Sequence, residues 1–103
     1  MTKQETAYLE IGRGFKDAEE GQLFGKPCFK IKGKPFVCFF ENSMVFKLIG
    51  KAHAEALGLS GSHLFDPSGK KRPMKEWVQV SFTHHAKWTK FAKSALNYVL
   101  STL

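Results

Sequence analysis

Three short, mostly apolar segments separated by two tight turns occupy the middle of the chain and restrict its fold more than any other feature. Gly33-Lys34 is typical of a turn, and so is Glu41-Asn42-Ser43, because Asn tolerates left-handed backbone geometry. Connections this short join antiparallel neighbours. The pattern therefore predicts a β-meander, with strands over residues 27–31, 35–40 and 44–48.

The middle strand of this meander is apolar on both faces, whereas its neighbours alternate. In the first strand Phe29 and Ile31 point one way and Cys28 and Lys30 the other. A strand that carries Phe36, Phe39 and Phe40 has to be covered on both faces, or nearly so.

The rest of the chain adds helices and a fourth strand. A fourth strand is expected over residues 77–82, with Val78, Val80 and Phe82 inward and Gln79 and Ser81 outward. Thr83 then suits the N-cap of the clearest helix, residues 84–102. One stripe of that helix is apolar: Trp88, Phe91, Ala92, Ala95, Leu96 and Val99. Shorter helices are expected over residues 2–12 and 51–57, which makes the fold class α+β.

The length of 103 residues predicts one domain, 1–103, large enough to bury a core without metals or disulfides. No apolar run is long enough for a signal peptide or a membrane span, so we expect a cytoplasmic protein without membrane contact. Cys28 and Cys38 are then expected as packed, reduced thiols. A three-residue loop at Gly33 would place them opposite each other and leave a disulfide open, whereas a two-residue Gly33-Lys34 loop would place Cys38 opposite Phe29.

Charge is distributed unevenly along the chain. The formal net charge is +7, but residues 1–21 carry a net charge of −2 and residues 22–103 a net charge of +9. A basic domain body is typical of proteins that meet an acidic partner such as nucleic acid or anionic lipid. Many domains also carry such a charge for solubility, so the charge alone does not choose between these interpretations.

The densest cationic segment follows the turn Asp66-Pro67-Ser68-Gly69, whose composition is that of a type I turn. Lys70, Lys71, Arg72 and Lys75 lie within six residues, beside Glu76 and Trp77. Asp66 is expected either to pair with a nearby cation or to bond to backbone amides of the turn. Trp77 has two interpretations, a platform for a nucleobase or a plug at the edge of the core, and its position favours the core.

Several stretches resemble one known family. They are Leu23-Phe24-Gly25, the hairpin 29–36, the strand 45–48, Phe65-Asp66-Pro67 and the run Arg72-Pro73-Met74-Lys75-Glu76-Trp77-Val78. Together they resemble the TfoX N-terminal domain family and the related YjbR (MmcQ)-like proteins of bacteria, over roughly residues 20–100. The Arg-Pro-Met-Lys-Glu-Trp run is the most specific part.

This resemblance implies a compact α+β domain in which an antiparallel sheet packs against helices. It also implies a DNA-binding role of the kind proposed for YjbR-like members. For TfoX itself it implies regulation of natural competence, but the sequence ends at Leu103 without the second domain of full-length TfoX regulators. The resemblance therefore predicts the domain type rather than competence regulation.

The sequence contains partial matches to catalytic and cofactor-binding motifs, but none of these matches is complete. Residues 21–27 are one residue short of a P-loop and have Pro27 in place of the hydroxyl. Gly12-Arg13-Gly14 lacks the third glycine of a dinucleotide fingerprint. A metal site would need distant ligands, because neighbouring His84 and His85 diverge on a helix. A thiol nucleophile is disfavoured for cysteines inside strands. We expect no enzyme activity, no cofactor and no metal.

The expected function is low-specificity nucleic-acid binding, with DNA as the partner. The phosphates would be contacted by residues 69–75, which we call the basic loop. Lysines would act as point charges, and Arg72 suits a bidentate contact. If the hairpin and the loop lie side by side, the interface comprises Lys70, Lys71, Arg72, Lys75, Lys30, Lys32 and Lys34. The alternative is a protein-interaction module of a regulatory system, acting through an exposed sheet edge or an apolar patch. A small-molecule sensor with a pocket between sheet and helix is a third possibility.

Overall fold

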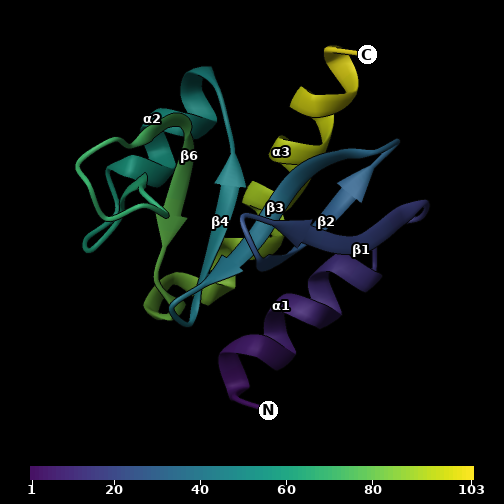
Figure 1. The fold of residues 1–103 in the computed structure, drawn as a ribbon, viewed down its shortest axis with the longest axis horizontal. Coiled ribbons are helices and arrows are strands. Elements are labelled where there is room, and N and C mark those ends of the chain that lie inside the picture. The colour runs from purple at the N-terminus through teal and green to yellow at the C-terminus, as the bar shows by residue number, and fades with distance from the viewer.

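The computed structural model describes all residues, Met1–Leu103, and shows an α+β fold built on one antiparallel sheet (Figure 1). The strands lie in the order β1-β2-β3-β4-β6-β5. The chain runs through α1 (Lys3–Arg13), β1 (Ala18–Leu23), β2 (Lys26–Ile31), β3 (Lys34–Phe40), β4 (Ser43–Lys47), α2 (Gly50–Leu57), β5 (His63–Phe65), β6 (Met74–Val80), the 3₁₀ segment η1 (Phe82–Lys87) and α3 (Trp88–Ser101). The predicted meander, the fourth strand and the helices are all present, which confirms the α+β fold class.

Two strands were not predicted, and both lie at an edge of the sheet. β1 has the exposed residues Glu19, Glu20 and Gln22, and β5 has only three residues. An edge strand pairs on one side only and tolerates charged side chains, so its sequence need not alternate or be apolar. The pattern that identifies central strands is therefore missing in β1.

All three helices pack on the same face of the sheet. Tyr8 from α1, Ala56 from α2 and the stripe Trp88, Phe91, Ala92, Ala95 and Val99 of α3 belong to one buried cluster with strand residues. Figure 1 shows α3 crossing behind the strands. None of the helices has the length and apolar character that a membrane crossing requires.

The opposite face of the sheet carries a second, smaller cluster to which no helix contributes. Its buried members are Cys28, Cys38, Val45, Phe65 and Trp77, and its partly buried members are Leu23, Phe40 and Met74. In the middle strand, Phe36, Val37 and Cys38 are all buried, so the expectation that β3 is covered on both faces is confirmed. We call this helix-free side of the sheet the outer face.

The hairpin β2–β3 has a different turn from the predicted one. Lys32 and Gly33 form the two-residue loop with φ of 50° and 81°, values typical of a type I′ turn, and Ile31 faces Lys34. Further along, Phe29 faces Val37, so β3 contains one extra residue and a β-bulge. The bulge brings Cys28 opposite Cys38, and both thiols are free.

The start of the C-terminal helix also differs from the prediction. Thr83 is not an N-cap, because its amide donates to Ser81 Oγ at 3.2 Å and Ser81 caps η1. His84 has non-helical dihedrals, and its Nε2 lies 2.8 Å from the Ser60 carbonyl oxygen. This tie to the segment after α2 interrupts the helix, so α3 begins only at Trp88.

Gln79, expected to face outward, is 5% exposed. β6 is an interior strand of the sheet, so Gln79 has a neighbour on each side. Val45 of β4 lies on one side, and His63 of β5, a strand that was not predicted, lies on the other. Trp77 is also 5% exposed and belongs to the outer-face cluster. Its interpretation as part of the core is confirmed.

Candidate nucleic-acid interface

The backbone of the basic loop is organised by one carboxylate. Asp66 Oδ1 accepts hydrogen bonds from the amides of Ser68 and Gly69, each at 3.2 Å, and from Ser68 Oγ at 2.7 Å. Its other oxygen, Oδ2, accepts from the Arg72 amide at 3.2 Å, across six residues of sequence. The predicted bonding of Asp66 to turn amides is confirmed, and the loop closes around this side chain.

Asp66 is held in its ionised form by these bonds. The Ser68 hydroxyl and the amides of Arg72, Gly69 and Ser68 lower the pKa of the Asp66 carboxyl below its usual value. Two of the loop's residues also adopt left-handed backbone geometry, Gly69 with φ of 68° and Lys71 with φ of 59°. The loop therefore has a defined backbone, although most of its side chains are in solvent.

The four cations of the loop are exposed and have no acidic partner. Lys70, Lys71, Arg72 and Lys75 all lie at the surface. The structure contains only two ion pairs, Arg13 with Glu20 and Lys90 with Glu55, and neither involves the loop. The charge of these side chains is therefore available to an external anion.

The loop continues into β6, and a histidine of α2 fixes this junction. His53 Nε2 lies 2.8 Å from the carbonyl oxygen of Lys75. A carbonyl only accepts, so this ring nitrogen carries the proton and donates. The helix α2 and the start of β6 are thereby joined, and Lys75 keeps its side chain free.

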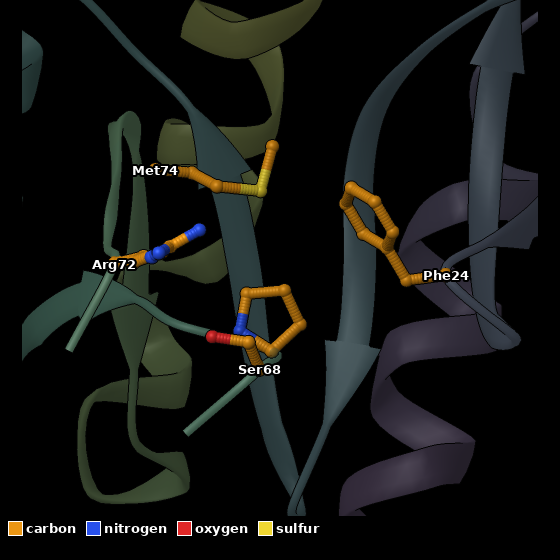
Figure 2. Close-up of a pocket in the computed structure, with 5 residues that line it drawn as sticks. Phe24, Ser68, Arg72 and Met74 are labelled. Atoms are coloured by element: carbon orange, nitrogen blue, oxygen red, sulfur yellow. The ribbon is translucent and has the colours of Figure 1, made fainter. Parts of the chain in front are cut away.

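A shallow groove runs along the loop on the outer face (Figure 2). It has a volume of about 310 Å³ and is lined by Phe24, Pro67, Ser68, Arg72 and Met74. Figure 2 shows Phe24 on one side, with Met74, Arg72 and Ser68 on the other. Two segments far apart in sequence, the β1–β2 turn and the β5–β6 loop, thus form its walls.

Phe24 stands out within this groove. Its side chain is 60% exposed, and its φ is 52° in the two-residue turn that it forms with Gly25. Asn, Asp and Gly are the residues that suit this position of a type I′ turn, and a bulky side chain at positive φ is uncommon. Local backbone preference and burial therefore both fail to explain a phenylalanine here.

Lys26, two residues after Phe24, adds a cation to this side of the groove. Its Nζ lies 5.3 Å from the centroid of the Phe40 ring, which in turn packs edge-on against Phe65 with the centroids 5.2 Å apart. Phe65 directly precedes Asp66. The β1–β2 turn and the basic loop are thus connected through aromatic side chains of the outer face.

Sequence reasoning did not select Phe24 or Lys26 as site residues. The sequence did contain one signal for Phe24. In the turn Phe24-Gly25, a large apolar residue occupies a position that favours Asn or Gly. The proximity of Phe24 to the loop could not be read from the sequence, because the two segments are far apart along the chain and meet only in the folded structure.

The structure does not place all the predicted lysines in one patch. Lys32 lies in the β2–β3 turn and Lys34 directly follows it, and this turn is at the opposite end of β2 from the β1–β2 turn that borders the groove. In Figure 1 that turn and the β5–β6 loop are on opposite sides of the view. Lys30 packs against Gly21 of β1, where a Cβ on Gly21 would lie 3.1 Å from Lys30 Cε. The structure instead brings the loop next to the β1–β2 turn.

The candidate catalytic groups are spread over the molecule. Burial raises the pKa of both Cys28 and Cys38, so these thiols are protonated at neutral pH. Glu76 accepts a hydrogen bond from the Tyr98 hydroxyl at 2.6 Å on the helix-covered side. His85 Nδ1 lies 3.0 Å from the Phe82 carbonyl oxygen, and nowhere do three His, Cys, Asp or Glu side chains gather in a way that could hold a metal ion.

Comparison with known proteins gave no match: no family model, no curated protein and no solved structure is detectably similar to the chain.

Proposed function

We propose that this protein is a non-enzymatic domain that binds nucleic acid with low sequence specificity, through phosphate contacts of Lys70, Lys71, Arg72 and Lys75. The observation that carries the proposal is that four cations without acidic partners are displayed on one loop with a defined backbone. DNA is the expected partner, because the cations would contact its phosphates.

The bonding of Asp66 decides which groups of the loop can contact phosphate. The amides of Ser68, Gly69 and Arg72 already donate to Asp66, so the backbone has few donors left for a ligand. The contacts then come from side chains. Lysine is a point charge, and Arg72 alone offers the fork that binds two phosphate oxygens at once. Phosphate contacts give affinity and orientation but do not read sequence.

The dependence of binding on salt tests this function, with the DNA affinity measured by fluorescence anisotropy. Each phosphate contact on duplex DNA contributes about 0.9 to the slope of log K against log salt concentration. We expect Lys70→Gln/Lys71→Asn to weaken binding and to reduce this slope by about one for each of the two lysines that touches a phosphate. Asn is chosen at position 71 because it tolerates the left-handed φ.

The matched control removes two charges elsewhere. Lys87→Gln/Lys93→Gln makes the same change in net charge at η1 and α3, on exposed positions of the helix-covered side. The control should bind with a slope close to that of the unchanged protein. Equal losses of affinity in both double variants would show a general effect of net charge, and no binding of DNA or RNA at low salt would remove the proposed function.

A second function, a protein-interaction module without nucleic-acid contact, is favoured by one observation. β1 is a six-residue strand at the edge of the sheet, with its outer backbone groups unpaired. Such an edge can accept a strand from a partner. A protein partner retained after nuclease treatment and released by Glu19→Lys/Gln22→Lys, but not by the loop variant, would support this function.

A further inference from the structure

The exposed ring of Phe24 requires an explanation that the phosphate contacts do not provide. The ring is 60% exposed on a turn whose backbone geometry favours Asn or Gly. Lys32 and Glu41 adopt a similar φ in their turns, so the feature that sets Phe24 apart is its exposed aromatic ring. Phe24 lies across the groove from Arg72, one of the four cations of the proposed interface.

We propose that the nucleic acid bound here is single-stranded, with one base stacked on Phe24 in the groove and the adjoining phosphate held by Arg72. This inference rests on the proposed nucleic-acid function and specifies its substrate class. Proteins that bind single strands without sequence preference combine a basic surface with aromatic side chains on which bases stack. The structure brings both elements together from two separate segments.

The lining of the groove matches a nucleobase and its phosphate. Phe24, Pro67 and Met74 offer apolar surface for the flat face of a base, while Arg72 offers a cation at one wall. Arg72 can also stack its planar guanidinium on a base. At about 310 Å³ and open to solvent, the groove lies at the lower limit of ligand pockets, about 300–1,000 Å³.

A duplex could use the phosphate contacts but not the ring. Its bases are stacked on one another, so their faces are inaccessible unless a nucleotide is flipped out at a cost of a few kcal/mol. An acidic peptide would satisfy the cations, but it carries planar side chains only at some positions, whereas every nucleotide of a single strand pairs a planar base with a phosphate. Charge complementarity together with the exposed ring therefore selects a single strand among polyanions.

The test compares the affinities of the full chain for a short fluorescein-labelled oligothymidylate and for a duplex of equal length. The variant is Phe24→Asn, which removes the ring and supplies a residue that suits the positive φ. Loss of folding is then not the reason for loss of binding. We expect single-strand affinity to fall about 5- to 100-fold, the loss that corresponds to one stacked base, and duplex affinity to stay unchanged.

Two further variants distinguish the contribution of the aromatic ring from a general effect of net charge. Phe24→Tyr keeps an aromatic face and should retain single-strand binding, and Lys87→Gln should weaken both ligands equally and slightly. Photo-cross-linking with an oligonucleotide that carries 5-iodouracil should label Phe24 itself.

The outcomes distinguish the two proposals. If Phe24→Asn binds the single strand as tightly as the unchanged protein does, while Lys70→Gln/Lys71→Asn still weakens binding, the stacking proposal is wrong and the phosphate-binding function stands. Poly-glutamate that competes as well as the oligonucleotide would also overturn it, in favour of an acidic protein partner. If the unchanged protein binds neither nucleic acid, both proposals fail.

Discussion

Single side chains determine both the shape and the accessibility of the interface. Asp66 accepts hydrogen bonds from three backbone amides of the loop. These amides are therefore not free to bind an anion, and the side chains of Lys70, Lys71 and Arg72 would have to provide the contacts. A residue with the charge of the ligand thus occupies the position where a phosphate would otherwise bind. Asp66 fixes the backbone of the loop, and the cationic side chains of the loop are exposed to solvent.

Acid should disorder this loop. The pKa of Asp66 is lowered, chiefly by the Ser68 hydroxyl, so the ionised carboxylate favours the folded loop. This contribution is present above the ordinary pKa of an aspartate and is lost as the pH falls through the lowered value. The amide resonances of Ser68, Gly69 and Arg72 in NMR spectra should therefore change together at a pH below 3.8, the usual pKa of Asp66.

The variant Asp66→Asn checks the assignment. Asn keeps one acceptor oxygen but replaces the other with an NH₂ group, which cannot accept from the Arg72 amide. The Arg72 amide should exchange faster in the variant at every pH, and the low-pH transition should disappear. A transition that persists in Asp66→Asn would assign the titration to another carboxyl group.

At the scale of elements, the contact between α1 and β2 depends on a missing side chain. Gly12 is buried in α1, and a Cβ built on it would lie 2.0 Å from a carbon of the Phe29 ring. We expect Gly12→Ala to lower the free energy of unfolding by about 1–3 kcal/mol through overpacking. The gain in helix propensity, about 1 kcal/mol at most, opposes this but is smaller. Chemical denaturation followed by circular dichroism measures the difference.

Gly14→Ala is the matched control, because the added Cβ would meet only carbonyl oxygens of Ile11 and Glu10 at 3.3 and 3.4 Å. Its effect should be small. If the clash with the ring is the cause, Phe29→Leu should reduce the cost of Gly12→Ala, and the double variant should be more stable than the sum of the single changes predicts. Additive effects would contradict this account.

The predictability of the elements follows from what surrounds them. β3 and the apolar stripe of α3 were visible because residues buried on defined faces must be apolar at fixed intervals. β1 was missed because an edge strand can be polar, and Gln79 was misplaced because its neighbour β5 was also missed. The register of Cys28 with Cys38 depends on a bulge, which neither the turn residues nor the alternation indicated.

For the whole molecule, the important property is that the sheet separates two faces that are covered differently. The helices cover one face, and the outer face has only a small cluster of strand residues beneath the groove. The density of positive charge in the loop could be read from the sequence, because charge density is a local property. The proximity of that loop to Phe24 could not be read from the sequence, since it depends on the tertiary arrangement of two segments that are far apart along the chain.

This separation predicts where a nucleic acid will contact the protein. In an NMR titration of the labelled domain with a short oligothymidylate, amide shifts should change at Phe24–Lys26 and at residues 68–75. The amides of α1 and α3 should change little, because the sheet lies between these helices and the groove. Lys70→Gln/Lys71→Asn should reduce both sets of changes at the same oligonucleotide concentration, since each lost phosphate contact lowers the affinity. Changes that centre on Lys87 and Lys93 instead would move the interface to the helical face and would contradict the assignment of the groove.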